Sequence, residues 1–313
     1  MSDFHLDGVA VVDKPAGMTS HDVVYAVRKK LHIKKVGHAG TLDPDATGVL
    51  VVGVGKGTRL LRFAQSAGKI YTGKIHFGAA TTTLDASGDV TASFDMSSLS
   101  RENTVSAAFS LTGKIQQIPP MISSIKFQGK RLHRLAREGY EVEREPRSVE
   151  VYDFVILGFK ESEDQRRHLK NAFSSDPAPV GPTAEVRVEC SSGTYVRSLA
   201  DDLGKLLGGG AFLSDLRRIQ SGHFHVDNAV TPEDLDAESL RPIIDLLQDL
   251  PKIVVPSALA GAVLNGKVLT RAELSCDGLG PWALVDDTGE LFGVYEPYTN
   301  SSIKPMLILA NSM

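Results

Sequence analysis

Cysteine is almost absent from the sequence, and long apolar runs are missing. The chain has 313 residues and two cysteines, Cys190 and Cys276, far apart in sequence, which disfavours a disulfide scaffold or a cysteine-based zinc site. No apolar run approaches the roughly 18 residues that a membrane span needs. The first residues, MSDFHLDG, carry neither a basic region nor a hydrophobic signal core. We therefore expect a cytoplasmic protein with no membrane association.

The sequence also lacks an excess of basic charge. It contains 34 Lys and Arg against 38 Asp and Glu, a formal net charge of −4, whereas contacts to phosphate require Lys and Arg. This average argues only mildly against a nucleic-acid-binding protein, because a basic face can coexist with acidic surface elsewhere. With 42% hydrophobic residues, the composition is that of a soluble globular protein with one large domain, or a large and a small one.

What the sequence does contain is a glycine-rich stretch from Lys35 to Gly57, KVGHAGTLDPDATGVLVVGVGKG, around which the chain is organised. Its first glycines permit tight turns, and residues 49–52 predict a short buried strand. Pro44 restricts its own φ and pushes Asp43 toward an extended conformation. The pattern predicts a carboxylate on a stiff loop beside a buried strand, a position suited to chemistry. An isolated Asp-Pro is more often a solvated turn.

The segment before this stretch predicts a strand, a turn and a helix. Residues 8–13 are mainly apolar and predict the strand. Lys14-Pro15-Ala16-Gly17 predicts the turn. Thr19 followed by Asp22 indicates a helix N-cap with an acid in the first turn.

The sequence GHAGTLDPDATGVL closely resembles the catalytic signature of the TruB family of RNA pseudouridine synthases. That signature reads Gly-His-x-Gly-x-Leu-Asp-Pro-x-Ala-x-Gly-x-Leu, and its aspartate is the catalytic residue. All fixed positions are met: Gly37, His38, Gly40, Leu42, Asp43, Pro44, Ala46, Gly48 and Leu50. The resemblance implies that Asp43 is catalytic. Lys14-Pro15 matches a second family feature, to which we assign a structural role.

Further matches to the family imply the other residues of the site. Tyr71 matches an active-site tyrosine, which would stack on the target base. In Gly-Thr-Tyr-x-Arg, Arg197 matches the arginine that pairs with the catalytic aspartate. The implied catalytic residues are Asp43, Tyr71 and Arg197. The implied substrate-binding residues are His38, Tyr71, Tyr195 and Leu216.

A basic segment follows in the middle of the chain. Leu132, Leu135 and Ala136 predict the apolar face of a helix that Gly139 can end. Five cations occur here before the first acid, Glu138: Lys126, Lys130, Arg131, Arg134 and Arg137. Ordinary helix surfaces mix charges more evenly, so the cluster favours contacts to an RNA backbone over a solvated face. In the family this region is an insertion that closes over the RNA, and we place it at residues 121–145.

The resemblance implies an α+β fold whose core is a mixed, mainly antiparallel sheet flanked by helices. Residues 1–250 would form the catalytic domain. Residues 251–313 look separate and similar to the PUA-like C-terminal β-domains of the family. Residues 161–182 are polar and contain three prolines, which predicts a surface loop without an assigned function.

The implied activity is the isomerisation of uridine to pseudouridine in the T-loop of tRNA, at position 55 in tRNA numbering. The expected partner is the tRNA T-stem-loop. We expect no cofactor, no obligate protein partner and a monomer. His223 and His225 have no further ligand cluster beside them, so a metal site is not expected.

Three alternatives stay open. Asp43 and Asp45 could form the carboxylate pair of a glycosidase, which the matches at Tyr71, Arg197 and Leu216 disfavour. A guide-RNA-dependent rRNA pseudouridine synthase shares the signature, although the insertion favours the stand-alone type. A non-catalytic protein that binds and folds tRNA would grip the same RNA.

Overall fold

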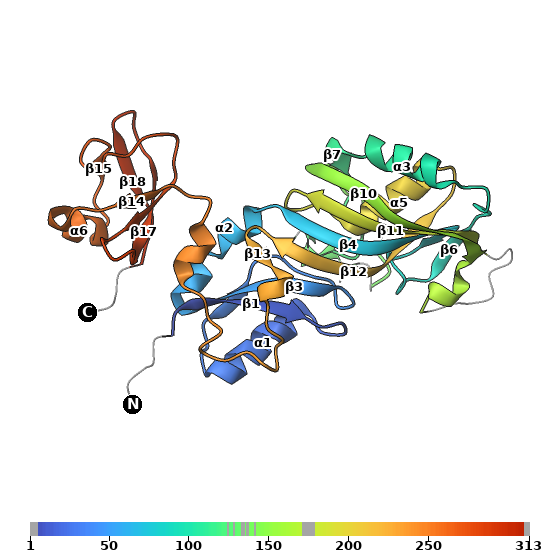
Figure 1. Cartoon of the computed structure of the whole chain (residues 1–313), viewed down its shortest axis with the longest axis horizontal. Helices are drawn as coiled ribbons and strands as arrows, with labels where there is room; N and C mark the ends of the chain where they lie inside the picture. Colours follow the sequence, from blue (N-terminus) through green and yellow to red (C-terminus); the bar gives the residue numbers. More distant parts are fainter. Residues whose placement is uncertain are drawn as a thin grey trace.

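A long, twisted sheet forms the centre of the larger part of the molecule (Figure 1). The computed structural model describes residues 6–123, 125–127, 129–132, 135, 138–140, 142–170 and 179–309. Nine of the described strands form this sheet, in the order β1-β3-β12-β4-β11-β10-β7, with β2 beside β3 and β13 beside β12. The strands are β1 (Gly8–Lys14), β2 (Val36–His38), β3 (Thr47–Val54), β4 (Lys69–Phe77), β7 (Gly113–Gln117), β10 (Arg147–Asp164), β11 (Val180–Cys190), β12 (Ala211–Ser221) and β13 (Phe224–His225).

All pairings in this sheet are antiparallel except one. β12 pairs in parallel with β3, through Arg217 opposite Thr47 and Arg218 opposite Gly48. On its other side, β12 runs antiparallel to β4. A strand from late in the sequence is therefore inserted between two strands from the first quarter of the chain.

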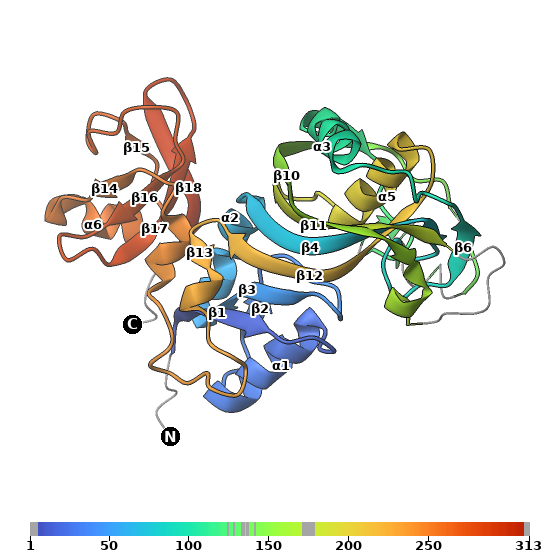
Figure 2. The same cartoon turned by 45° about the vertical axis from the view of Figure 1, so that its right-hand side comes forward.

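Helices cover the sheet in two places. Figure 2 shows α3 (Arg101–Ser110) and α5 (Val196–Leu206) over the β10–β11 part, and α1 (Ser20–Leu31) beside β1. Buried side chains of α5, β4, β11 and β12 form one apolar core. A second core lies between α1 and the strands β1 and β3. The predicted cap of α1 is confirmed, because Thr19 and Asp22 form a reciprocal capping box.

Short elements connect these strands. They are η1 (Gly55–Arg59), α2 (Leu61–Ser66), β5 (Ala79–Thr81), β6 (Val90–Ser93), β8 (Lys126–Phe127), β9 (Lys130–Arg131), η2 (Gln165–His168), η3 (Val226–Asn228) and η4 (Ile243–Leu247). β5 pairs with β6, and β8 pairs with β9.

A separate five-stranded sheet is built from the last part of the chain, in the order β14-β16-β17-β18-β15. Its elements are β14 (Lys252–Val254), α6 (Ser257–Leu264), β15 (Leu269–Thr270), β16 (Trp282–Val285), β17 (Leu291–Pro297) and β18 (Ser302–Ile308). It has a core of its own around Trp282 and Tyr295. A further apolar cluster joins Val285 and Val294 to Val9 and Val51 of the large sheet. The predicted α+β class is confirmed, and the domain boundaries stay a prediction.

The loop predicted at residues 161–182 is wrong at both ends. β10 continues to Asp164 and β11 starts at Val180, and the two pair as far as Asp164 opposite Val180. Gln165, between them, is completely buried. Residues 161–164 of β10, Glu-Ser-Glu-Asp, are all polar or charged, so the apolar–polar alternation of a strand is absent and composition indicated a loop. Within the described residues, no helix is long and apolar enough to cross a membrane.

Candidate active site

Asp43 lies on a loop that is held rigidly between β2 and β3. Within the loop, the Ala46 amide donates to the Asp43 carbonyl at 3.1 Å. The Leu42 amide donates to the buried Ser20 Oγ of α1 at 2.9 Å. At Gly48, where φ is 99°, a Cβ would lie 2.1 Å from the Arg218 carbonyl oxygen. Only glycine fits there, because β12 approaches β3 so closely.

The side chain of Lys14 also holds the Asp43 loop in place. Its side chain is fully buried, and Nζ donates to the carbonyls of Pro15, Met18 and Pro44 at 3.0, 2.7 and 3.0 Å. Burial lowers the pKa of Lys14 to about 8. The Pro44 carbonyl also accepts from the Gly17 amide at 2.9 Å. These contacts are what a structural role for the Lys14-Pro15 turn requires.

Arg197 and Asp43 form an ion pair, as the resemblance implied. Arg197 is 3% exposed, and its Nε lies 3.0 Å from Asp43 Oδ2. Its terminal nitrogens donate to the carbonyls of Thr83 at 2.8 Å and Ile122 at 2.9 Å. Asp85 Oδ2 lies 3.6 Å from Arg197 Nη1. The guanidinium is therefore fixed in its plane and joins three separate loops to α5.

Opposing effects act on the charge of the Asp43 carboxylate. Burial raises the pKa of Asp43 above its usual range, and the Arg197 guanidinium opposes that rise. The nearby Asp85 carboxylate raises the pKa further. Sequence analysis did not single out Asp85, because nothing in its local sequence indicates a place beside Arg197.

A pocket of about 230 Å³ opens in front of Asp43. Asp43, Tyr71, Tyr195, Arg197 and Leu216, five of the residues implied by the resemblance, all line it. They come from the 39–46 loop, β4, the start of α5 and β12, so the sheet order brings together segments far apart in sequence. The pocket can hold a small flat group next to a carboxylate.

Two hydrogen bonds with Gln117 position the backbone of Tyr195, whereas Tyr71 is held by burial. The Tyr195 amide donates to the buried Gln117 Oε1 at 2.7 Å, and Gln117 Nε2 donates to the Tyr195 carbonyl at 3.1 Å. Tyr71 is 8% exposed, and burial raises the pKa of its hydroxyl. Tyr71 lies on β4.

His38 is the one implied substrate-binding residue that does not line this pocket. It ends β2, with its ring centroid 5.5 Å from that of His21 in an edge-to-face arrangement. Burial lowers the pKa of His38, which favours the neutral imidazole. Any contact of His38 with a substrate would therefore be made outside the pocket.

Two cations of the pocket were missed by sequence reasoning. Lys69 precedes Tyr71 by two residues on β4, and Arg218 lies opposite Tyr71 on β12. Arg218 donates to the carbonyl of Val49 at 2.7 Å, and its terminal nitrogens lie 3.3 Å and 3.5 Å from the carbonyls of Gly40 and Thr41. Both residues lie within two positions of a residue that the resemblance implied, Tyr71 or Leu216. A lysine or arginine in a sequence is nevertheless normally assigned to the surface.

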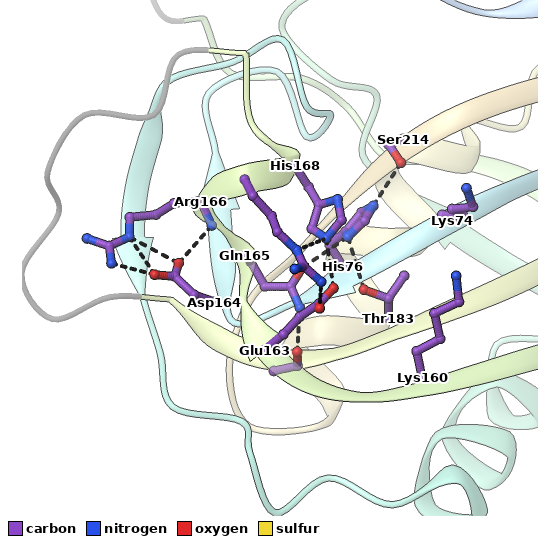
Figure 3. Close-up of polar contacts among 12 residues, drawn as sticks. Lys74, His76, Lys160, Glu163, Asp164, Gln165, Arg166, His168, Thr183 and Ser214 are labelled. Carbon is purple, nitrogen blue, oxygen red and sulfur yellow. Dashed lines mark hydrogen bonds and ion pairs between the residues drawn. The ribbon is translucent and has the colours of Figure 1, made fainter.

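A second cavity, of about 490 Å³, lies on the other side of Asp43 and shares Asp43, Arg197 and Leu216 with the first. His76 lines this cavity. Figure 3 shows its ring contacted by Gln165 of η2, Thr183 of β11 and Ser214 of β12. His76 Nδ1 lies 3.0 Å from Gln165 Oε1, and Nε2 lies 2.8 Å from Ser214 Oγ. Burial lowers the pKa of His76 to about 4.

Four cations around the cavity have carboxylate partners: Lys170 with Asp45, Lys74 with Asp215, Lys160 with Glu185, and Arg167 with Glu163.

The predicted basic segment is described only in part. Leu132 and Leu135 are helical and buried, at 2% and 8% exposure, and the Tyr140 amide donates to the Leu135 carbonyl just after Gly139. Lys130 is exposed, and its Nζ lies 3.9 Å from Glu138 Oε2. Arg134 and Arg137, and the side chains of Lys126 and Arg131, lie outside the described residues. The contacts predicted between this cluster and RNA stay a prediction.

Comparison with known proteins identifies the family of the chain. The family model of the N-terminal domain of TruB family pseudouridylate synthases matches residues 28–196. The model of the tRNA pseudouridylate synthase B C-terminal domain matches residues 197–256. A tRNA pseudouridine synthase B from Symbiobacterium thermophilum is 45% identical over 83% of this chain and 82% of its own. One from Geobacillus thermodenitrificans is 40% identical over 97% and 99%.

Solved structures share the fold. A crystal structure of a Cbf5–Nop10–Gar1 complex contains a chain with a TM-score of 0.71 and 24% identity, covering 98% of this chain and 86% of that one. An H/ACA RNP bound to a substrate RNA gives a TM-score of 0.69 at 22% identity, over 97% and 85%. The family models together match residues 28–256, and relatives at 40% identity extend over nearly the whole length. The chain belongs to the TruB family of pseudouridylate synthases.

Proposed function

We propose that this protein isomerises uridine to pseudouridine at position 55 in the T-loop of tRNA. The observation that carries the proposal is the Asp43–Arg197 ion pair, 3.0 Å long, at the wall of a pocket lined by Tyr71, Tyr195 and Leu216. The relatives that align over nearly the full length are named tRNA pseudouridine synthase B, which supports tRNA as the substrate.

The reaction requires the target nucleotide outside the stack. A base inside a folded loop cannot present its glycosidic bond to a side chain, so the nucleotide must be flipped into the pocket. Asp43 then acts on the flipped uridine as a nucleophile or as a general base. Arg197 holds the Asp43 carboxylate in place. Tyr71 stacks on the base and assists a late proton transfer, while Tyr195 and Leu216 contact the uridine.

His38 has a different place in this proposal. Because it lies outside the pocket on the β2 side of the Asp43 loop, it is suited to fill the gap that the flipped base leaves, or to hold the neighbouring loop bases. The five-stranded sheet at residues 252–308 would act as a PUA-like RNA-binding domain. We propose a cytoplasmic monomer that needs neither a guide RNA nor a protein partner.

The test is an assay on an unmodified tRNA transcript. Purified protein is expected to form one pseudouridine, at position 55, in a transcript with no other component added. A matched transcript with cytidine at that position should remain unmodified. Binding without any pseudouridine would favour the RNA-binding or RNA-folding alternative. Activity that appears only after addition of a guide RNA would favour the guide-dependent alternative.

The basic segment supplies a second test. Arg131→Ala with Arg134→Ala is expected to weaken tRNA binding and to reduce the slope of log K against log salt by about 1.5, because two phosphate contacts are lost. The matched control is Lys114→Ala with Lys205→Ala, which removes the same charge from β7 and α5. Equal slopes in the two double variants would assign the cluster to an ordinary solvated surface.

A further inference from the structure

Lys69 and Arg218 are two buried cations in the Asp43 pocket that have no carboxylate partner among the described residues. Lys69 is 6% exposed and Arg218 is 1% exposed. The Lys69 Nζ donates to the carbonyls of Gln65 at 2.8 Å and Ala67 at 2.5 Å. Arg218 contacts three backbone carbonyls and lies 3.5 Å from the Tyr71 hydroxyl oxygen. All of these partners are neutral.

Both cations are brought to one end of the pocket by the sheet. Lys69 and Tyr71 are two apart on β4, so their side chains leave the same face. Arg218 is directly opposite Tyr71 on β12. A Cβ built on Gly40 would lie 3.8 Å from Arg218 Nη1 and 3.9 Å from Lys69 Cε. The two side chains therefore meet over the same point of the Asp43 loop, and both line the pocket.

This arrangement is electrostatically costly for the free protein. Burial and, to a smaller extent, the Arg218 charge lower the pKa of Lys69 to about 8. The third cation that lines the pocket, Arg197, pairs with Asp43 and Asp85. Lys14, whose contacts are likewise to carbonyls, does not line the pocket. Lys69 and Arg218 line the pocket and form no ion pair with Asp43 or with any other described carboxylate, which indicates that an anion binds or forms beside them.

A purely structural role explains part of the geometry. The carbonyls of Gln65 and Ala67 lie at the end of α2, where a lysine commonly satisfies unpaired helix carbonyls. That role uses two of the three ammonium protons. Arg218 likewise joins the Gly40-Thr41 segment to β3. Neither role accounts for the absence of a carboxylate beside both charges, nor for their position in the pocket wall.

We propose that Lys69 and Arg218 form an anion subsite that stabilises the uracil ring after it has separated from the ribose. The proposal rests on the proposed isomerisation. When the C1′–N1 bond breaks, its electron pair stays on the ring and the charge spreads over N1, O2 and O4. The Asp43 carboxylate stabilises the positive charge that develops at C1′. Bond formation from C5 to C1′, loss of the C5 proton and protonation of N1 complete the isomerisation without gain or loss of atoms.

The subsite acts like an oxyanion hole. Its charges are already in place before the reaction, and they interact most strongly with the ring when it is anionic. A neutral uracil ring in the substrate gains less from them, so their contribution falls mainly on turnover and little on RNA binding. A phosphate-binding role predicts the reverse distribution, because a phosphate carries the same charge before and after the reaction.

The deciding experiment uses Lys69→Met, which keeps the length of the side chain and removes its charge. Single-turnover rates are measured on a T-stem-loop RNA, and affinity is measured for the same RNA with an abasic ribose at the target position. The rate is expected to fall by about 10²–10³-fold, with affinity for the abasic RNA unchanged. Lys114→Met, on the exposed edge strand β7, is the matched control and should retain the wild-type rate.

A matching loss of affinity for the abasic RNA would overturn the proposal in favour of a phosphate contact, and an unchanged rate would overturn it outright. Wild-type protein that forms no pseudouridine would instead overturn the proposed function.

If Lys69→Met does not fold, the pH dependence of kcat/KM in Lys69→Arg tests the proposal. The wild-type kcat/KM should fall above about pH 8 as the ammonium deprotonates. Lys69→Arg should lack that fall, and a fall of equal size in both proteins would contradict the proposal.

Discussion

Asp43→Asn is expected to abolish pseudouridine formation, by at least about 10⁴-fold in rate, while tRNA affinity stays within about threefold. The amide has nearly the shape of the carboxylate and can still accept a hydrogen bond from Arg197 Nε, which lies 3.0 Å from Oδ2. It can act neither as a nucleophile nor as a general base. Single-turnover assays with excess enzyme measure the rate, and filter binding measures affinity.

The matched control for this prediction is Asp45→Asn. Asp45 is exposed and pairs with Lys170 at 2.7 Å, on the side of the second cavity. If Asp43 works alone, the Asp45 variant retains turnover. Loss of turnover in both variants would restore the carboxylate pair of a glycosidase-like mechanism, and full turnover by Asp43→Asn would remove Asp43 from the chemistry.

Arg197→Met is expected to reduce both the free energy of unfolding, by about 3 kcal/mol, and the turnover rate, by about 100-fold or more. The substitution leaves the carbonyls of Thr83 and Ile122 without their donor, and it leaves Asp43 without its cation. Buried polar groups that lose a partner carry the full cost of desolvation. Urea unfolding and single-turnover kinetics measure the two effects.

Arg197→Lys separates charge from geometry. Lysine restores a positive charge but cannot make the planar set of contacts to Asp43, Thr83 and Ile122. We expect part of the stability to return and the turnover rate to stay low. Wild-type turnover in Arg197→Lys would mean that charge alone is required, and that the fixed orientation of the guanidinium is unimportant.

The frame of Asp43 could be predicted because local rules dictate it. The Asp-Pro pair, the glycines and the following apolar run specify a stiff turn beside a strand, and β3 confirms the strand. The α1 cap followed from Thr19 and Asp22 in the same way. The pairing of Asp43 with Arg197 has no such local signal. It came from resemblance alone, since 154 positions separate the two residues.

Long-range pairing also explains what could not be predicted. The end of β10 is charged and polar, yet its backbone pairs with β11 up to Asp164. Lys69 and Arg218 look like surface cations in sequence, and only the register of β4 against β12 buries them together. Burial of a charged residue depends on which strand arrives beside it, and the sequence of that residue's own strand does not specify this.

The place of β12 between β3 and β4 has a consequence for synthesis. β3 and β4 leave the ribosome early, but β12 becomes available only after residue 221 has been translated. Until then, a nascent chain carries Asp43 on the loop before β3 and Tyr71 on β4, and the strand edges that β12 would pair with are open. Unpaired strand edges are prone to aggregation. We therefore expect polypeptides that end before β12 to be inactive, so that the site is completed only late in translation.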